Sequence, residues 1–278
     1  MLERKLTIGR SKYNDQREGR NSGDGNYKSI TSENIYSRST FKTYLKHGCY
    51  FAKWAKEVHG CKDLKSAHEH VNEYLQYRID MGLSPYTQKL DASALAKIYG
   101  CRTTDFIKTQ TRYRAGITRS RGKKAMDKHF SETKNRDFIE FCRATGLRRS
   151  ELERLRSDQL RYDEKDNTYS LEIKGKGGRI RFALILTQEA VDRIKSVDGR
   201  VWERIPSKAD IHSYRADYCR AVYDMYARPK NKIPKEDRYC CRKDRAGEWF
   251  DKPAMEIASQ ALGHNRINII ASHYLYSG

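Results

Sequence analysis

Six residues in the second half of the chain have side chains suited to the cleavage of a phosphodiester. In chain order they are Arg148, Lys176, His212, Arg215, His264 and Tyr274. Such a reaction needs a nucleophile, stabilisation of charge on the non-bridging oxygens and a proton for the departing alkoxide. A guanidinium can donate two parallel hydrogen bonds to phosphate oxygens and keeps its charge, an ammonium can give up a proton, and a phenolate can attack. The set therefore contains a candidate for each role.

These residues lie in short motifs that follow one another along the chain. The motifs are Gly146-Leu-Arg148 with Ser150-Glu-Leu152, Gly175-Lys-Gly-Gly178, His212-Ser-Tyr-Arg215, Leu262-Gly-His264 and the tyrosine at position 274. In types and order they resemble the catalytic domain of tyrosine recombinases, the phage integrase family. Five elements in the family's order argue against coincidence. The resemblance covers residues 40–278, by motifs in the second half and by pattern alone before it.

The resemblance assigns the first catalytic arginine to Arg148 and not to Arg149, because Arg148 directly follows Gly146-Leu147. We expect Arg149 to face solvent or nearby DNA. Glu151 lies one helical turn from Arg148. It can either orient the guanidinium or form a simple pair on a helix surface, and the sequence leaves both alternatives open.

The resemblance also implies roles for the lysine and the histidines. Lys176 corresponds to the lysine that gives a proton to the leaving 5′ oxygen, with Lys174 as the rival. His212 and Arg215, three residues apart on one helix face, can address one phosphate together. His264 corresponds to the histidine that donates a hydrogen bond to the scissile phosphate.

Two tyrosines near the end of the chain compete for the role of nucleophile. The family places its tyrosine nine or ten residues beyond the second histidine. Tyr274 fits that offset from His264 and Tyr276 does not. The resemblance therefore favours Tyr274, which would form a 3′-phosphotyrosine ester that conserves the energy of the broken bond.

Composition supports a polyanionic partner. Fifty-six Lys and Arg against 36 Asp and Glu leave a formal charge of +20. Each phosphate that a cation neutralises releases counterions and adds affinity independent of sequence. We therefore expect double-stranded DNA recombination sites as the partner, the alternative being a basic surface that only keeps the protein soluble.

No membrane or extracellular segment is expected. The sequence has no run of 18 apolar residues and its N-terminus lacks the apolar core of a signal peptide, so we expect no membrane partner and a cytoplasmic, nucleoid-associated protein of bacterial or phage origin. Seven scattered cysteines indicate reduced thiols. The adjacent pair Cys240-Cys241 lacks the spacing of a zinc half-site. We therefore expect no metal and no cofactor.

Periodicity and composition divide the chain into segments. We expect a flexible basic arm over residues 1–38, a helical core-binding domain over 39–101, a basic linker over 102–124 and a catalytic domain over 125–278. Expected helices cover residues 40–57, 66–81, 85–100, 137–145, 187–197, 211–226 and 254–261, with a further short one starting near Ser150. Expected strands, at 168–173 and 179–185, flank a Gly-rich hairpin turn. The predicted fold is mainly α with a small antiparallel β-sheet (α+β).

The basic linker is the candidate for further DNA contacts. It holds eight Lys or Arg and one Asp, and either wraps the DNA backbone between two domains or is simply solvated. The residues proposed to bind DNA are Arg102, Lys108, Arg112, Arg114, Arg119, Arg121, Lys123 and Lys124.

Two features depart from the family pattern. Arg215 and His264 are 49 residues apart, about twice the family's usual interval, which predicts an insertion at 230–253. This hairpin or loop contacts DNA, contacts a partner protomer or elaborates the surface. The sequence also ends four residues after Tyr274, whereas many relatives carry a further helix that docks on a neighbouring subunit. That puts tail-mediated assembly in doubt.

The resemblance implies a site-specific DNA recombinase, or integrase, of mobile genetic elements that cleaves and rejoins strands through a covalent 3′-phosphotyrosine intermediate. It further implies a homotetramer on DNA and accessory DNA-bending or directionality proteins. A type IB topoisomerase-like relaxing enzyme shares this chemistry, and strand exchange between duplexes would distinguish the two. A non-catalytic DNA-binding regulator is the third reading, and it would form no covalent adduct.

Overall fold

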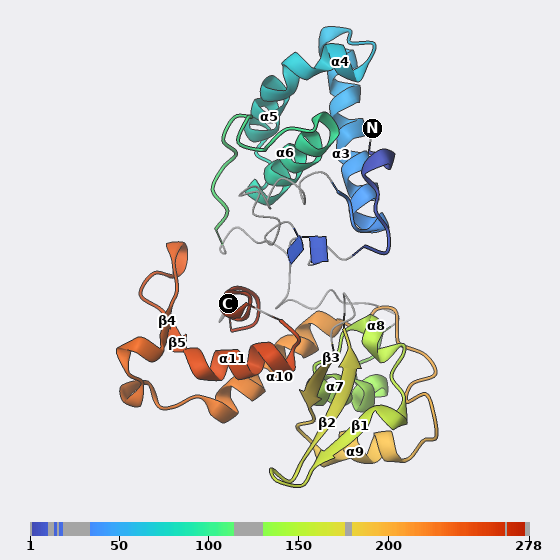
Figure 1. Cartoon of the computed structure of the whole chain (residues 1–278), viewed down its shortest axis with the longest axis vertical. Coiled ribbons are helices and arrows are strands. Elements are labelled where there is room, and N and C mark those ends of the chain that lie inside the picture. The colour runs from blue at the N-terminus through green and yellow to red at the C-terminus, as the bar shows by residue number, and fades with distance from the viewer. Residues whose placement is uncertain are drawn as a thin grey trace. The chain divides into compact units, whose positions relative to one another are not determined.

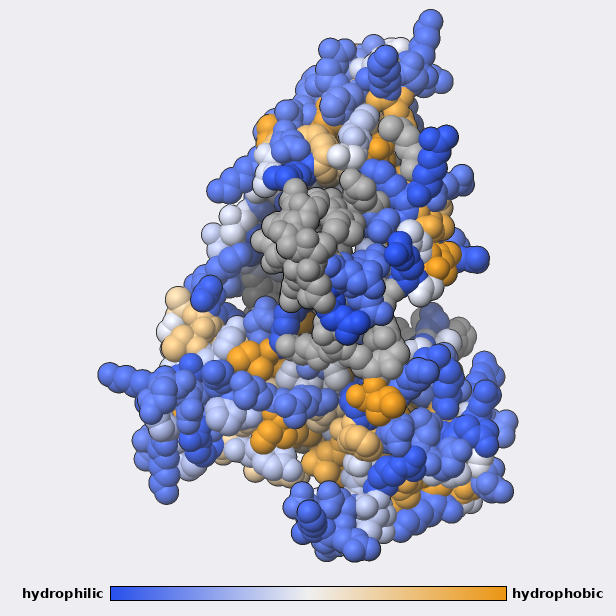
Figure 2. All heavy atoms as spheres, in the orientation of Figure 1, coloured by the Kyte–Doolittle hydropathy of each residue, from blue (hydrophilic) through white to orange (hydrophobic). Residues whose placement is uncertain are grey.

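The computed structural model describes residues 2–10, 14–15, 17–18, 34–113, 130–175, 180–264 and 266–275. The chain divides into two compact units, Met1–Gly116 and Ile117–Gly278, so the division falls inside the segment 102–124 (Figure 1). Hydrophilic residues cover most of the face drawn in Figure 2, as the composition requires. Within the described ranges, no helix has the length and apolar character needed to cross a membrane.

The N-terminal unit is built from helices whose ends carry the expected signals. Ser37, one turn before the first apolar residues, accepts a hydrogen bond from the backbone N–H of Thr40 at 3.2 Å and is the N-cap of the helix that starts at Arg38. Gly60 and Gly100 end two helices in the left-handed conformation. The helices are α3 (Arg38–His59), α4 (Leu64–Ala67), α5 (Val71–Asp80) and α6 (Pro85–Tyr99), with the 3₁₀ helix η2 (His68–His70) before α5.

Aromatic side chains form the centre of this unit. Phe51 is fully buried and meets the ring of Tyr74 edge to face at 5.2 Å. Leu75 and Leu95 complete the centre. Phe51 and Tyr74 are thus packed inside the unit, whereas Tyr50, which is also on α3, is 42% exposed.

The described residues of the expected flexible arm pack on this unit, which corrects that expectation for them. Leu2 and Ile35 are buried in the core, and Leu6 pairs with Ile35 in a parallel β-bridge. The ammonium of Lys5, in the 3₁₀ helix η1 (Glu3–Lys5), donates to the carbonyl of Lys97 at 2.9 Å. The apolar side chains of Leu2, Leu6 and Ile35 therefore hold these residues to the helices.

The first part of the expected linker is also packed. Phe106 and Ile107 lie against the same core, and the backbone N–H of Ile107 donates to Asn72 at 2.9 Å. Residues 102–113 therefore belong to the helical unit and are not part of a free linker. The remaining linker arginines and lysines, Arg114, Arg119, Arg121, Lys123 and Lys124, lie outside the described residues.

The C-terminal unit combines helices with a small antiparallel sheet, as predicted. The sheet has the order β1-β2-β3, and in its register Leu171 faces Ala183. The first strand was not expected; it is only four residues long, and its residues after Leu160 are exposed. The elements are α7 (Arg136–Thr145), α8 (Arg149–Leu152), β1 (Leu160–Asp163), β2 (Thr168–Lys174), β3 (Ile180–Leu184), α9 (Gln188–Lys195), α10 (Ile211–Tyr226), α11 (Lys252–Ala261) and α12 (Ile267–His273).

Helix α10 separates two apolar clusters. One lies between α7, α9 and the sheet and includes Leu147 and Leu171. The other lies between α10, α11 and α12 and includes Val222, Met255 and Ile270. A buried polar residue on α10 can therefore contact elements from both clusters.

The expected insertion 230–253 contains a short hairpin. Strands β4 (Arg238–Cys240) and β5 (Trp249–Asp251) pair with Tyr239 opposite Phe250. Asp251, fully buried, accepts hydrogen bonds from the Arg228 guanidinium at 2.9 and 2.8 Å. This ion pair closes the base of the insertion between α10 and α11.

Candidate active site

The Gly-Leu-Arg motif is a tight corner between α7 and α8. Gly146 ends α7 at φ +57°, and a Cβ there would collide with the ring of Tyr218. Only glycine satisfies both demands. Leu147 is fully buried and anchors the corner, so the next residue, Arg148, starts α8 from a fixed position.

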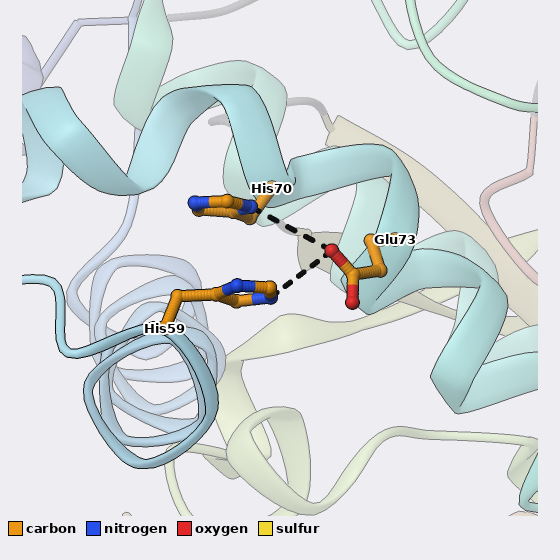
Figure 3. A group of neighbouring side chains, drawn as sticks. All are labelled: His59, His70 and Glu73. Atoms are coloured by element: carbon orange, nitrogen blue, oxygen red, sulfur yellow. Dashed lines mark ion pairs between the residues drawn. The ribbon is translucent and has the colours of Figure 1, made fainter.

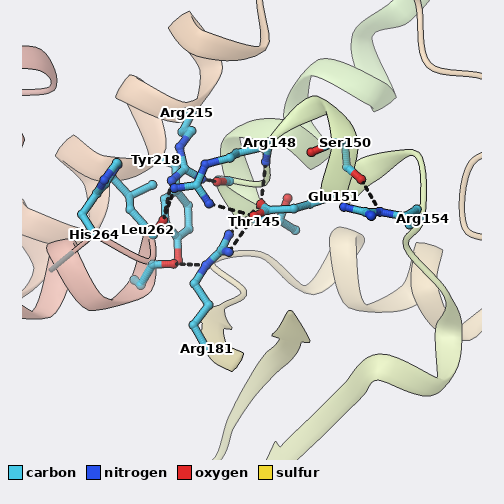
Figure 4. Close-up of polar contacts among 12 residues, drawn as sticks. Thr145, Arg148, Ser150, Glu151, Arg154, Arg181, Arg215, Tyr218, Leu262 and His264 are labelled. Carbon is cyan, nitrogen blue, oxygen red and sulfur yellow. Dashed lines mark hydrogen bonds and ion pairs between the residues drawn. The ribbon is translucent and has the colours of Figure 1, made fainter. Parts of the chain in front are cut away.

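Glu151 organises the arginines at this corner (Figure 4). It is 5% exposed, and each of its carboxylate oxygens lies 2.8 Å from a donor on Arg148 and 2.8 Å from the guanidinium of Arg181. Burial alone would raise the pKa of Glu151, but hydrogen bonds and charge from Arg181 and Arg148 lower it to about 2. The carboxylate is therefore ionised at neutral pH; its pair with Arg181 is buried, and its pair with Arg148 is partly buried, the Arg148 side chain being 27% exposed.

Arg181 is a site residue that the sequence analysis missed. It lies on β3, where it shares a face with buried Ala183, while its neighbours Ile180 and Phe182 are exposed. Arg181 thus points inward in a strand whose two neighbouring apolar side chains point outward. This reversal of the usual pattern is the signal that could have revealed it, because a buried charge needs partners. Its Nε also donates to the carbonyl of Ala261 at 3.1 Å, which joins β3 to α11.

Arg215 brings α10 into the same site. It is 1% exposed, and its guanidinium donates to the carbonyls of Gly146 and Leu262. The Leu262 carbonyl also accepts from Arg148 at 3.3 Å, so one oxygen holds both arginines. Burial lowers the pKa of Arg215, as does the charge of Arg148, but a guanidinium remains protonated at neutral pH.

A histidine and a tyrosine complete the cluster. Nε2 of His264 lies 3.1 Å from the hydroxyl oxygen of Tyr274, and Nε of Arg215 lies 3.4 Å from the same oxygen. Burial, and then the charges of Arg215, Arg148 and Arg181, lower the pKa of His264 to about 4. At neutral pH the imidazole is therefore neutral, and Nε2 can accept the hydroxyl proton of Tyr274.

The other residues named by the sequence analysis either lie elsewhere in the structure or fall outside the described residues. His212 lies in the first turn of α10 and is exposed. Lys176 and Tyr276 lie outside the described residues. Arg149, which was expected to face solvent or DNA, is half-buried, and its guanidinium donates to three backbone carbonyls, those of Pro206, Ser207 and Ala209, at 2.9 to 3.2 Å.

The insertion contacts the segment that carries Tyr274. Arg245, 7% exposed, donates to the carbonyl of Ala271 at 2.5 Å and to that of Leu275 at 3.3 Å. These two carbonyls flank Tyr274 along the chain. The described contacts of the insertion therefore include the end of α12 in its own chain, a role that sequence reasoning had not considered.

The cluster carries more positive than negative charge. Arg148, Arg181 and Arg215 bring three guanidinium groups to one carboxylate, that of Glu151, and His264 adds no charge when neutral. Buried charges need compensation, so this excess favours an anion beside the Tyr274 hydroxyl. A phosphate group has the oxygens to accept from several guanidinium groups at once.

No protein-family model matches the sequence, and no curated protein matches it significantly. Among solved structures, the chain is similar to the Tn1549 transposon integrase in complex with circular intermediate DNA, at 14% identity and a TM-score of 0.38, over 82% of this chain and 94% of that one. It is similar to XerA recombinase at 14% identity and a TM-score of 0.31, over 95% and 94%. It is also similar to XerH site-specific recombinase bound to a palindromic difH substrate, at 14% identity and a TM-score of 0.44, over 96% and 82%. These three similar structures are thus those of an integrase and two recombinases.

Proposed function

We propose that this protein is a site-specific DNA recombinase that cleaves and rejoins DNA through a covalent 3′-phosphotyrosine intermediate. One observation carries the proposal: the Tyr274 hydroxyl lies within 3.1 Å of His264 and 3.4 Å of Arg215, in a cluster with an excess of buried guanidinium charge. A nucleophile and charge stabilisation are thus adjacent.

The reaction that we propose is a transesterification. The Tyr274 oxygen attacks the phosphorus, its proton passes to Nε2 of His264, and the bond from phosphorus to the 5′ oxygen breaks. Arg148 and Arg215 stabilise the added negative charge of the five-coordinate transition state, and Glu151 positions Arg148. Religation runs the same steps in reverse, with a free 5′ hydroxyl as the nucleophile, so no external energy source is needed.

Lys176 is our proposed donor of the proton to the leaving 5′ oxygen. The residues that flank the segment 176–179 support this: Arg181 binds Glu151, and Gly175 and Glu151 line a common open pocket of about 380 Å³. A substrate with sulfur in place of the bridging 5′ oxygen needs little protonation. We therefore expect Lys176→Ala to be strongly impaired on normal DNA and largely restored on the sulfur substrate, while equal impairment on both would favour Lys174.

A nicked suicide substrate tests the proposed function. The full-length protein should form a covalent adduct, seen by denaturing electrophoresis, in the presence of excess chelator. Tyr274→Phe should form none while binding DNA normally, because only the phenolic oxygen is removed. Tyr276→Phe is the matched control and should form the adduct. An adduct that persists in Tyr274→Phe, or a strict need for a divalent ion, contradicts the mechanism.

Two duplexes with recombination sites separate strand exchange from relaxation. Recombinant products support the recombinase, whereas relaxation of supercoils alone supports a topoisomerase-like activity. We propose that the active assembly is a homotetramer on paired DNA sites, which the size of the protein-DNA complex in solution would test, and that DNA-bending or directionality proteins assist it.

We also propose that basic residues around the junction of the two units contact DNA phosphates. Of these, Arg102, Lys108 and Arg112 are described, and the Arg112 guanidinium lies 5.5 Å from the ring centre of Tyr86. Neutralising Arg112, Arg114, Arg119 and Arg121 should flatten the plot of log affinity against log salt by roughly 0.9 per lost phosphate contact. Base preference should survive. An unchanged slope with lost site preference would contradict this proposal.

A further inference from the structure

Two histidines and a glutamate meet on the N-terminal unit (Figure 3), whereas the residues of the proposed active site belong to the C-terminal unit. His59 is the last residue of α3, His70 the last of η2, and Glu73 lies in the first turn of α5. Nε2 of His59 lies 3.0 Å from Oε2 of Glu73, and Nδ1 of His70 lies 3.6 Å from the same oxygen. The three atoms are all within 4.8 Å of one another.

We propose that His59, His70 and Glu73 bind a divalent transition metal ion of the zinc class. Two imidazole nitrogens and one carboxylate oxygen form a ligand set that zinc accepts, with water in the fourth position. Ligand atoms about 2.0–2.2 Å from a tetrahedral ion lie roughly 3.4 Å apart. The distances of 3.0 and 3.6 Å fall on either side of that spacing, and the two rings, which lie parallel, must turn out of their stack to direct both lone pairs at one ion.

The surroundings of the two imidazoles favour metal binding. The rings stack with their centres 3.6 Å apart and 7° between their planes, and both side chains are 23% exposed, which leaves room for them to turn towards an ion. The ring of Trp54 meets His59 edge to face at 5.2 Å. These contacts hold both rings at one place on the surface before an ion arrives, which lowers the entropy lost on binding.

A second carboxylate lies behind His70. Oε1 of Glu69 is 3.6 Å from Nε2 of His70, the ring nitrogen that does not face Glu73. A carboxylate at the distal nitrogen of a ligating histidine fixes the tautomer and makes the other nitrogen a better ligand. Here it favours a proton on Nε2 and leaves the lone pair of Nδ1 for the ion.

The bound ion would add a link between two helices that already pack through Phe51 and Tyr74. His59 ends α3, whereas His70 and Glu73 belong to the segment from η2 to α5. An ion held by all three would therefore fix the end of α3 against α5 and stabilise the N-terminal unit by binding only its folded form. This role is independent of the proposed recombination chemistry, because none of the three residues takes part in it.

The test uses the full-length protein after removal of metals with a chelator. We expect calorimetric titration with Zn²⁺ to show one site and the melting temperature to rise with Zn²⁺ concentration. His59→Gln, His70→Gln and Glu73→Gln should each weaken binding by about tenfold or more. His68→Gln is the matched control, because His68 lies in the same 3₁₀ helix but packs against Tyr99 with ring centres 4.3 Å apart. It should bind Zn²⁺ normally.

Cobalt distinguishes this site from the cysteines. With Co²⁺ as a probe, the proposed ligands give d–d absorption in the visible range without a thiolate charge-transfer band. The proposal is overturned if no Zn²⁺ binds. It is also overturned if binding survives the double change His59→Gln with His70→Gln, or if the cobalt complex shows thiolate ligation. Circular dichroism of each variant confirms that it is folded.

Discussion

Each unit of the chain buries a carboxylate between two nitrogen-containing side chains, and the two clusters differ in their charge. In the N-terminal unit, fully buried Asp91 lies 2.5 Å from Nδ1 of His47 and 3.1 Å from Nε of Arg78. In the C-terminal unit, Glu151 is bonded to Arg148 and Arg181. Both carboxylates join elements that are distant in the sequence.

The difference lies in what surrounds the carboxylate. Among the described residues, Asp91 pairs with one guanidinium and one imidazole, so the carboxylate is matched by a single permanent positive charge. Beside Glu151 a third guanidinium, that of Arg215, lies at the hydroxyl of Tyr274. A balanced cluster is sufficient to hold a fold, whereas buried charge in excess needs an anion from outside. The balance of charge, and not burial alone, therefore marks the functional site.

The largest expected effect comes from removing an arginine of the charged cluster. Arg148→Ala or Arg215→Ala should slow cleavage by about 100- to 1000-fold, because each loses a donor to the transition state, and DNA affinity should fall less. Single-turnover cleavage of a suicide substrate measures the rate. Arg78→Met in the balanced cluster should instead lower the free energy of unfolding by about 3 kcal/mol and leave the cleavage rate of the folded protein unchanged. Equal effects on cleavage would erase the distinction between the clusters.

The second prediction concerns the pH dependence of stability at Glu151. Its folded pKa of about 2 is below its ordinary value of 4.5, so it contributes stability above about pH 4.5 that is lost as pH falls towards 2. The contribution is about 3 kcal/mol. Glu151→Gln should therefore lower the free energy of unfolding at neutral pH, and its difference from wild type should shrink on acidification. Urea denaturation at several pH values measures this, with Glu153→Gln, exposed nearby, as a control expected to show no such convergence.

The third prediction asks whether the guanidinium charge acts on His264. In the free protein the pKa of His264 should be about 4, below its ordinary value of 6.5. The contribution of neutral His264 to the free energy of unfolding should therefore be fully present above about pH 6.5 and be lost as pH falls towards 4. A bound DNA phosphate should raise that pKa, because it offsets the charge of Arg215 and Arg148. Imidazole resonances recorded with and without DNA measure the change, and the signal missing in His264→Gln identifies the residue. An unchanged pKa on DNA binding would show that no phosphate reaches the cluster.

The smallest expected effect tests the insertion. Arg245 donates to the carbonyls of Ala271 and Leu275 on either side of Tyr274, so Arg245→Met should slow cleavage by roughly tenfold without weakening DNA binding. Arg245→Lys should restore part of the rate. Arg242→Met, in the same insertion but exposed at the start of η7 (Lys243–Arg245), is the control and should cleave normally. A loss of affinity in place of rate would instead assign the insertion to DNA contact.

Much of the framework could be predicted from the sequence because it depends on local patterns. A repeat of apolar residues every three to four positions predicted the helices, and the bounds expected for residues 211–226 are those of α10. The motifs named Arg148, Arg215, His264 and Tyr274, and the structure brings these four together. Strand β1 was not found in this way, because a run of four residues, three of them exposed, is too short for its pattern to stand out.

What the sequence by itself determined is the identity and order of the candidate catalytic residues. The tertiary structure alone decided their partners: Arg181 against Glu151, the Leu262 carbonyl between two arginines, and Arg245 beneath the end of α12. It also decided that Arg149 donates hydrogen bonds to backbone carbonyls and that Leu2 and Ile35 are buried in the core of the N-terminal unit. These contacts join residues tens of positions apart, and a pattern in a short window reports which face of an element is buried but not which distant group it meets there.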